Sequence, residues 1–251
     1  MLHLTRHDPP PDVPAATPLV IAHGLFGSSR NWGVIARRLA DSRPVIAVDL
    51  RNHGASPWYA THTYADMADD LAQVLIAHGP ADVLGHSMGG KAAMVLALSR
   101  PELIRRLIVA DIAPVGYNHS QMPQIAAMRR VDLTRVTSRA EATAMMRAES
   151  PEIAAFLLQS LDLEARAWRL NLDVLQAAMP AIIGFPPVSG QFAGPALFLS
   201  GAQSSYVRPA HRGAIVPLFP QARFAVIEGT GHWLHAEKPR EVEAAVRGFL
   251  A

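Results

Sequence analysis

One hexapeptide, GHSMGG at residues 85–90, constrains the fold of this chain more than any other feature. It follows a short apolar run at residues 81–84 and matches the pattern G-x-S-x-G, in which a serine occupies a sharp turn between a strand and a helix. Gly85 and Gly89 leave room where the two backbones approach each other, and the backbone of Ser87 must be strained. The pattern therefore predicts a strand, a turn that exposes a hydroxyl group, and a helix.

Segments typical of strands alternate with segments typical of helices around this motif. Further apolar runs that predict buried strands lie at residues 19–22, 44–49, 106–110, 196–200 and 223–227. Apolar residues at helical spacing, or small apolar residues throughout, predict helices at residues 32–39, 63–78, 89–98 and 240–250. This alternation predicts an α/β fold with a mostly parallel central sheet and helices on both of its faces.

The alternation is interrupted between residues 115 and 194. That segment contains helical stretches and frequent methionines, but no run typical of a strand, and it closes with GFPP at residues 184–187. We therefore predict two parts: an α/β core formed by residues 1–114 and 195–251, and a helical cap, residues 115–194, inserted between two core strands.

Composition limits the environment of the protein. Half of the 251 residues are hydrophobic, which suffices for one large domain with an insertion. No apolar run approaches the ~20 residues of a membrane span. The first 18 residues are polar and rich in proline, without the apolar centre of a signal peptide, so we expect a cytoplasmic location. The absence of cysteine excludes disulfides, thiol catalysis and thiolate metal sites.

Several classes of partner are disfavoured by the same composition. The formal net charge is only +2, lysine occurs only as Lys91 and Lys238, and the arginines are scattered rather than clustered, which argues against a nucleic-acid surface. The histidines are dispersed without carboxylates at the spacing of metal ligands. No G-x-G-x-x-G motif follows a predicted strand. We expect neither a metal nor another cofactor.

A reactive serine needs a base, and His232 is the best candidate. It lies in the sequence GTGHW at residues 229–233, directly after the last predicted core strand, where a loop at the carboxyl edge of the sheet can reach Ser87. His235 is expected to face elsewhere from the start of the next helix. His86, inside the motif, is expected to pack beneath the loop.

The carboxylate that would orient His232 is less evident. The loop after the strand predicted at residues 196–200 contains GAQS and offers no acid. Asp111 ends the preceding core strand beside the motif, where it could accept a hydrogen bond from Nδ1 of His232 and leave Nε2 free for the proton of Ser87. Glu228 is the rival, but it lies too close to His232 along the chain. We predict that Asp111 is the acid.

Backbone N–H groups are the expected oxyanion donors. One is that of Met88, the residue after the nucleophile. The other should come from the loop HGLFG at residues 23–27, where Leu25 is our first choice and Phe26 the second. His23 would then hold this loop in place.

Together these segments resemble the α/β-hydrolase superfamily, and more narrowly the YbfF-type esterases and related abhydrolase-domain serine hydrolases. The matching stretches are HGLFGS (23–28), DLRNHGAS (49–56), GHSMGGK (85–91), DIAP (111–114), SSYV (204–207) and GHWLHAEKP (231–239). The resemblance is collinear over nearly the whole chain and weakest in the cap. It implies that the acid stands at Asp111 and that Ser204 assists the triad by hydrogen bonding near His232.

The leading functional hypothesis is a cofactor-free serine carboxylesterase or acyl hydrolase for small-molecule substrates. Ser87 would attack a short- to medium-chain acyl ester, or a thioester, and form an acyl-enzyme. Five aromatic residues, together with the methionines of the cap, are predicted to line an apolar acyl pocket. These five are Phe26, Trp168, Phe185, Tyr206 and Trp233.

Two alternatives remain open at this point. The same triad could perform carbon–carbon bond hydrolysis, lyase or perhydrolase chemistry on an anionic substrate. Candidate anion-binding residues are Arg30, Arg129, Arg130 and Arg169. A ligand-binding receptor without turnover belongs to a different class, and the complete set of Ser87, Asp111 and His232 argues against it. Lys91 is predicted to be a core lysine whose hydrogen bonds are satisfied.

Overall fold

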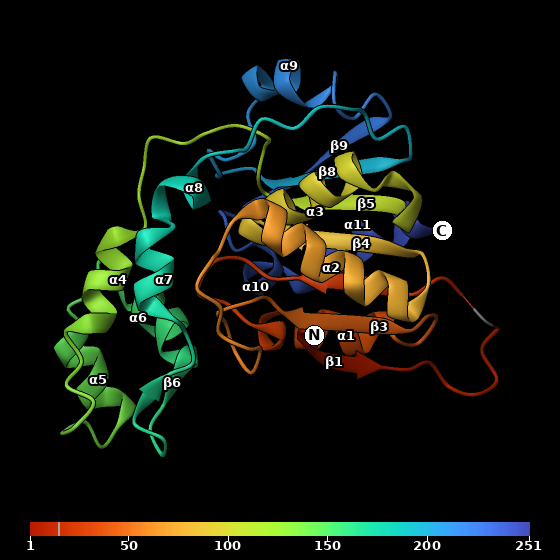
Figure 1. Cartoon of the computed structure of the whole chain (residues 1–251). Helices are drawn as coiled ribbons and strands as arrows, with labels where there is room; N and C mark the ends of the chain where they lie inside the picture. Colours follow the sequence, from red (N-terminus) through yellow and green to blue (C-terminus); the bar gives the residue numbers. More distant parts are fainter. Residues whose placement is uncertain (15) are drawn as a thin grey trace.

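A seven-stranded sheet forms the centre of the computed structural model, which describes residues 1–14 and 16–251. Its strands lie in the order β1-β3-β2-β4-β5-β8-β9 (Figure 1). Their bounds are β1 His3–His7, β2 Leu19–Ala22, β3 Val45–Asp49, β4 Ala81–His86, β5 Ile104–Ala110, β8 Ala196–Gly201 and β9 Ala222–Ile227. Every neighbouring pair is parallel except β1 with β3. The predicted α/β fold is confirmed.

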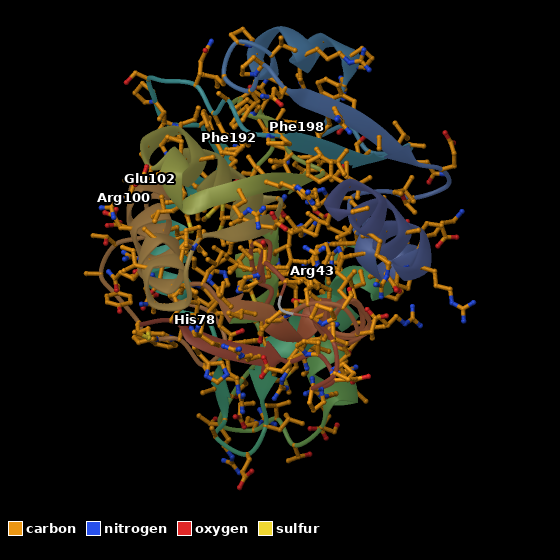
Figure 2. All side chains as sticks on the ribbon, turned by 90° about the vertical axis from the view of Figure 1, so that its right-hand side faces the viewer. Arg43, His78, Arg100, Glu102, Phe192 and Phe198 are labelled. Atoms are coloured by element: carbon orange, nitrogen blue, oxygen red, sulfur yellow. The ribbon has the colours of Figure 1, made fainter. Side chains whose placement is uncertain are left out.

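Helices cover both faces of the sheet. One face packs against α2 (Tyr64–His78) and α3 (Met88–Ser99), and the other packs against α1 (Gly33–Leu39) and α11 (Pro239–Leu250). Each face therefore has its own apolar cluster, which explains why the central strands are apolar along their whole length. Figure 2 shows Phe198 of β8 inside the molecule, whereas Arg100 and Glu102, just after α3, lie at its edge.

Strand β1 is not among the strands predicted from the sequence. It pairs antiparallel with β3, and only at one edge of the sheet, so its residues are partly exposed. An edge strand with one neighbour needs no continuous apolar run, and HLTRH contains none. Hydrophobic patterning alone does not distinguish such a strand from the polar, proline-rich residues that follow it.

Residues between β5 and β8 form a group of short helices beside the core, at the left in Figure 1. The helices are α4 (Met122–Arg129), α5 (Arg139–Met146), α6 (Pro151–Leu157), α7 (Leu172–Ala177) and α8 (Met179–Ile183). A two-stranded hairpin, β6 (Leu161–Asp162) with β7 (Ala167–Trp168), corrects the expectation that this segment lacks strands. Two residues per strand are too few to leave a periodic pattern. The division into core and cap domains stays a prediction.

Short elements complete the connections. The single-turn 3-10 helices are η1 (Ser29–Trp32), η2 (Pro101–Leu103), η3 (Leu158–Ser160) and η4 (Pro209–His211), and the short α-helices are α9 (Arg212–Ile215) and α10 (Leu234–Glu237). Crossing a bilayer takes about 20 apolar residues in one helix, and none of the helices within residues 1–14 and 16–251 meets that requirement.

Gly89 permits the close approach of α3 to the end of β2. A Cβ atom at this position would lie 2.5 Å from the carbonyl oxygen of His23. We expect Gly89→Ala to destabilise the fold strongly, by several kcal/mol, because a backbone clash cannot be relieved by a rotamer change. The free energy of unfolding in urea measures the effect.

Gly33→Ala provides the control in another helix. A Cβ atom there would meet only the end of the Arg37 side chain, at 3.5 Å. Alanine is a better helix former than glycine, so this variant should be neutral or more stable by up to about 1 kcal/mol. Equal stability of the two variants would contradict the close approach.

Candidate active site

Ser87 occupies the turn between β4 and α3 with a φ of 51°. Its N–H group donates to the carbonyl oxygen of Ala110 at 2.9 Å, which ties the turn to the neighbouring strand β5. A positive φ is costly for a residue with a side chain and persists only where the surroundings enforce it. The hydroxyl group of Ser87 is therefore held at the carboxyl edge of the sheet.

His232 bridges Ser87 and Asp111. Its Nε2 atom lies 3.0 Å from Oγ of Ser87, and its Nδ1 atom lies 2.7 Å from Oδ2 of Asp111. The three residues follow β4, β5 and β9, whose carboxyl ends meet at one edge of the sheet. A carboxylate can only accept a hydrogen bond, so Nδ1 of His232 carries the proton that it donates to Asp111. Nε2 is then unprotonated and can accept the proton of the serine hydroxyl group.

Asp111 is completely buried, and three donors surround its carboxylate. Besides His232, the N–H of Gly201 donates to Oδ1 at 3.1 Å, and Oγ of Ser204 makes a short hydrogen bond to Oδ2. A buried carboxylate needs such partners to offset its lost hydration. The rival acid Glu228 is exposed after β9 and is not among the groups bonded to His232 in the described chain.

Two aromatic rings hold the imidazole of His232. Tyr206 stacks on it with ring centroids 4.0 Å apart and an interplanar angle of 20°, and His86 lies 4.9 Å away on a tilted plane. Nε2 of His86 donates to the carbonyl oxygen of His232 at 3.0 Å. Burial lowers the pKa of His86 well below its usual value, so it remains a neutral, packed side chain.

The loop after β2 presents backbone N–H groups beside Ser87. Nδ1 of His23 donates to the carbonyl oxygen of Gly24 at 2.7 Å, and Nε2 accepts from the N–H of Leu50 at 3.0 Å. The N–H of Phe26 donates to Nε2 of His53 at 3.2 Å. Because Phe26 has this partner, Leu25 is the more available donor of the two.

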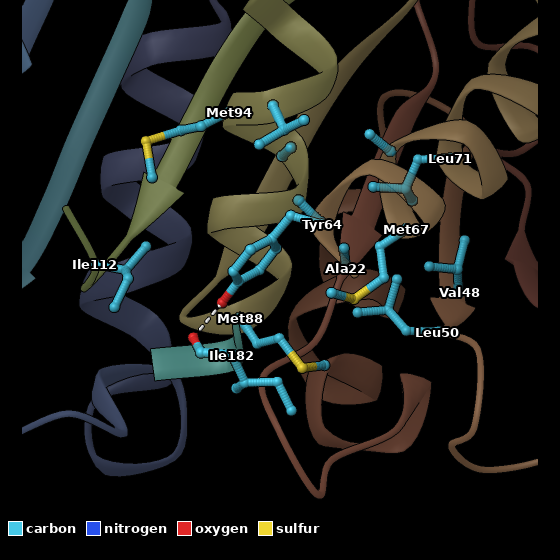
Figure 3. Close-up of a cluster of buried hydrophobic side chains, with 14 of the residues drawn as sticks. Ala22, Val48, Leu50, Tyr64, Met67, Leu71, Met88, Met94, Ile112 and Ile182 are labelled. Carbon is cyan, nitrogen blue, oxygen red and sulfur yellow. Dashed lines mark hydrogen bonds between the residues drawn. The ribbon is translucent and has the colours of Figure 1, made fainter. Parts of the chain in front are cut away.

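A cavity of about 250 Å³ opens over these groups. Ser87, His232, Leu25 and Met88 line it from the core. Apolar side chains of the segment between β5 and β8 line its opposite side: Ile153, Phe156, Leu157, Ile182 and Ile183. Tyr64 of α2 donates from its hydroxyl group to the carbonyl oxygen of Ile182 at 2.6 Å (Figure 3), which fixes one side of this apolar wall.

Three of the five predicted pocket residues line the cavity, namely Phe26, Tyr206 and Trp233. Trp168 and Phe185 are not among its lining residues, which corrects the prediction for both. Trp168 is buried in the hairpin, and Phe185, partly buried just after α8, packs against the apolar cluster that includes α2 and α3, so both side chains serve packing. Phe156, which the sequence did not single out, lines the cavity and contacts Trp233 at a centroid distance of 5.5 Å.

The prediction that methionines between β5 and β8 line the cavity is also wrong. Met128, Met146 and Met179 are buried within it, and none of its methionines lines the cavity. His235, predicted to face elsewhere, lines the cavity and stacks on Trp32 with centroids 4.5 Å apart. Burial lowers the pKa of His235 to about 3, so its ring contributes a neutral surface.

The four arginines proposed for anion binding lie outside the cavity lining. Arg129 pairs with Asp173 at 2.5 Å and Arg169 pairs with Asp162 at 2.7 Å. Arg130 donates to the carbonyl oxygen of Met146 at 3.2 Å. Arg30 lines two separate surface depressions instead.

Lys91, one helical turn after Ser87, contributes to the cavity wall. Its Nζ donates to the carbonyl oxygen of Ile183 at 3.1 Å and, in a short hydrogen bond, to that of Gly184. The ammonium group also lies 4.8 Å from the ring centre of Tyr117. Burial lowers the pKa of Lys91 to about 7. Its hydrogen bonds are satisfied, as in a core lysine, but its place in the wall was not predicted.

Within the described residues, no cluster of three or more histidine, cysteine, aspartate or glutamate side chains has the geometry to hold a metal ion. The polar residues that the structure does bring together at the base of the cavity are Ser87, His232 and Asp111, which are joined by two hydrogen bonds. The strand-turn-helix that carries Ser87 and the mostly parallel sheet beneath it are typical of the α/β-hydrolase class of proteins.

Comparison with known proteins agrees with this class. Residues 17–239 match the family model described as alpha/beta hydrolase fold, and the chain belongs to that family. It is 42% identical over 240 residues to esterase YbfF of Escherichia coli, covering 93% of each chain. It is 39% identical over 247 residues to the mouse sn-1-specific diacylglycerol lipase ABHD11, covering 93% of this chain and 80% of the relative.

A solved structure gives the same picture. The structure titled marine microorganism esterase superposes with a TM-score of 0.92 and 32% sequence identity, covering 99% of this chain and 98% of the other. The similarity therefore includes the segment between β5 and β8 as well as the sheet.

Lys91→Met should change how stability depends on pH. In the folded protein Lys91 loses its proton near pH 7, whereas in the unfolded chain it keeps it to about pH 10.5. Between pH 7 and pH 10.5 the unfolded chain binds more protons at Lys91 than the folded protein does, so the free energy of unfolding rises with pH in this range. Below pH 7 Lys91 is charged in both states, and the folded protein is destabilised by the full cost of burying that charge.

Methionine leaves the carbonyl groups of Ile183 and Gly184 without this donor at every pH, so the prediction concerns the trend: the stability of the variant relative to wild type should be most favourable at pH 6 and should decline towards pH 10. Urea unfolding at a series of pH values measures the difference. Lys238→Met, the same substitution at a less buried lysine, controls for the loss of a positive charge as such. Parallel curves for wild type and Lys91→Met would contradict the prediction.

Proposed function

We propose that this α/β hydrolase is a serine carboxylesterase that cleaves short- to medium-chain acyl esters. The observation that carries the proposal is the hydrogen-bonded series Ser87–His232–Asp111, with distances of 3.0 and 2.7 Å, at the base of an apolar-walled cavity. Relatives named as an esterase and as a diacylglycerol lipase support ester bonds as the target.

The first half of the reaction acylates Ser87. His232 takes the hydroxyl proton at Nε2 while Oγ attacks the ester carbonyl carbon. Asp111 holds the imidazole in the required tautomer and stabilises the imidazolium that forms. The negative charge that develops on the carbonyl oxygen is stabilised by the N–H groups of Met88 and Leu25.

The second half releases the acyl group. The imidazolium of His232 protonates the departing alkoxide, which breaks the carbon–oxygen bond and leaves the acyl group on Oγ of Ser87. Water then enters, gives a proton to Nε2, and attacks the acyl carbon, so that Ser87 recovers its proton and the carboxylic acid leaves. A thioester would follow the same steps with a thiolate as the leaving group.

The size and lining of the cavity favour a modest apolar acyl group. About 250 Å³ is just below the range of typical drug-sized pockets, 300–1,000 Å³. Ile153, Phe156 and Leu157 offer an apolar surface without a guanidinium group among the described lining residues. Carbon–carbon hydrolase and lyase reactions on anionic substrates are less well supported, since the candidate arginines bond elsewhere. The expected cytoplasmic location stays a prediction.

Ser204 is proposed as an auxiliary residue that acts through Asp111. Its hydroxyl group donates to Oδ2, the same oxygen that accepts from His232. A second donor stabilises the negative charge of the carboxylate and fixes its plane, because a charged acceptor binds each donor more strongly than a neutral one does. Removing it should weaken the site without abolishing it.

Hydrolysis of p-nitrophenyl esters from acetate to palmitate tests the proposal. We expect turnover to peak at a short or medium chain length, because the cavity limits the acyl group that can reach Ser87. Ser87→Ala should lower kcat by roughly 10⁴-fold or more. Wild-type protein that is as inactive as the variant on every ester would contradict the esterase proposal.

Two variants separate the roles of Asp111 and Ser204. Asp111→Asn should lower kcat by about 10⁴-fold, because the amide favours the wrong tautomer of His232. Ser204→Ala should lower it only about tenfold, which corresponds to one hydrogen bond to a charged group. Steady-state kinetics with the best ester measures both effects. Equal losses in the two variants would contradict an auxiliary role for Ser204.

A further inference from the structure

The loop that carries Leu25 is a tight turn with an unusual residue at its third position. The N–H of Gly27 donates to the carbonyl oxygen of Gly24 at 3.0 Å, so residues 24–27 form a hydrogen-bonded four-residue turn. Phe26, the third residue, has a φ of 63°. Turns that need a positive φ at this position usually place glycine or asparagine there. Phenylalanine adopts such a conformation only when its surroundings support it.

The core supports the N–H side of Phe26 through His53. Nδ1 of His53 donates to the carbonyl oxygen of Arg51 at 2.9 Å, which leaves Nε2 as the acceptor for the N–H of Phe26 at 3.2 Å. Burial and the nearby rings of His23 and His62 lower the pKa of His53 well below its usual value. The acceptor therefore remains unprotonated.

The segment between β5 and β8 supports the carbonyl side. Oγ of Ser160, the last residue of η3, donates to the carbonyl oxygen of Phe26 at 3.0 Å, and the side chain of Ser160 is buried. The adjacent Gln159 accepts from Nδ2 of Asn31 at 2.8 Å. Two polar contacts thus join η3 to the loop after β2 and to the helix η1 that follows it.

The turn sets the direction of the Leu25 N–H. The carbonyl group of Gly24 and the N–H of Leu25 belong to one planar trans peptide and point in opposite directions. Because the Gly24 carbonyl oxygen is held by His23 and by Gly27, the N–H of Leu25 is fixed as well. Loss of the positive φ at Phe26 would break the Gly27 hydrogen bond and release this peptide.

We infer that His53 and Ser160 are positioning residues for the oxyanion hole: together they hold Phe26 in its left-handed conformation and thereby aim the N–H of Leu25 at the substrate carbonyl oxygen. Because Ser160 belongs to η3, the direction of the Leu25 N–H group depends on the position of η3 against the loop after β2. The segment that forms the far wall of the cavity is in this way coupled to the catalytic loop. The inference rests on the proposed esterase function.

Ser160→Ala is the first test, with p-nitrophenyl butyrate as substrate and butane boronic acid as the tetrahedral analogue. We expect kcat to fall about tenfold to a hundredfold, up to the lower end of the roughly 10²–10³-fold loss found when one oxyanion donor is removed outright, because here the donor is misdirected and not removed; KM should change less than twofold. The inhibition constant of the boronic acid should rise by the same factor as kcat/KM falls. Ser160→Thr, which keeps the hydroxyl group, should restore most of the activity.

Two further comparisons separate positioning from general destabilisation. Ser138→Ala removes the N-cap of α5 in the same segment and should lower thermal stability without lowering kcat. In a Phe26→Gly background, Ser160→Ala should have a smaller effect on kcat, because glycine adopts a positive φ without support. His53→Gln, which keeps an acceptor, should be more active than His53→Leu.

The outcomes distinguish the two proposals. Wild-type protein without turnover on any ester would contradict the esterase function, and the inference would fall with it. An active wild type with an unchanged kcat and unchanged boronic acid inhibition in Ser160→Ala would overturn the inference alone. An equal effect of Ser160→Ala in the wild-type and Phe26→Gly backgrounds would overturn it too.

Discussion

The buried charge of Asp111 is the constraint on which the site depends. A carboxylate with no exposed surface must be surrounded by donors, and the three that serve it come from the ends of two strands: Gly201 and Ser204 at the end of β8 and just after it, and His232 after β9. Because Asp111 itself follows β5, satisfying this one group brings together the ends of three adjacent parallel strands. The position of His232, and through it the distance to Ser87, follows from that requirement.

Strained backbone occurs at three positions of the proposed site. Ser87, Asp111 and Phe26 all have positive φ angles, of 51°, 53° and 63°. Each donates a hydrogen bond from its backbone N–H group to a neighbouring segment: Ser87 to the carbonyl oxygen of Ala110, Asp111 to that of Leu199, and Phe26 to Nε2 of His53. Such strain is stable only inside a rigid scaffold, and the sheet with its two apolar faces provides it. The groups proposed as nucleophile, acid and oxyanion loop are thus held in fixed positions by the scaffold itself.

Much of this organisation could be predicted from the sequence because it depends on local patterns. Buried parallel strands are continuous apolar runs, the motif around Ser87 specifies its own turn, and the missing carboxylate at residues 201–204 directs attention to Asp111. Strand β1 was not predicted because an edge strand needs no apolar run. Trp168 and Phe156 are both aromatic residues of the segment between β5 and β8, but Phe156 lines the cavity and Trp168 does not. This difference depends on tertiary packing alone. Pairings across the chain, such as Ser160 with Phe26, leave no local pattern at all.

The central claim is that Ser87 is a nucleophile activated by His232 and Asp111. Reaction with a fluorophosphonate, followed by peptide mass spectrometry, tests it most directly, because the reagent forms a covalent bond only with an activated serine and needs no knowledge of the natural substrate. Wild-type protein should carry one adduct, on the peptide that contains Ser87, and Asp111→Asn should label far more slowly while remaining folded. An adduct on a different residue, or labelling of Ser87 at the same rate in both proteins, would contradict the claim.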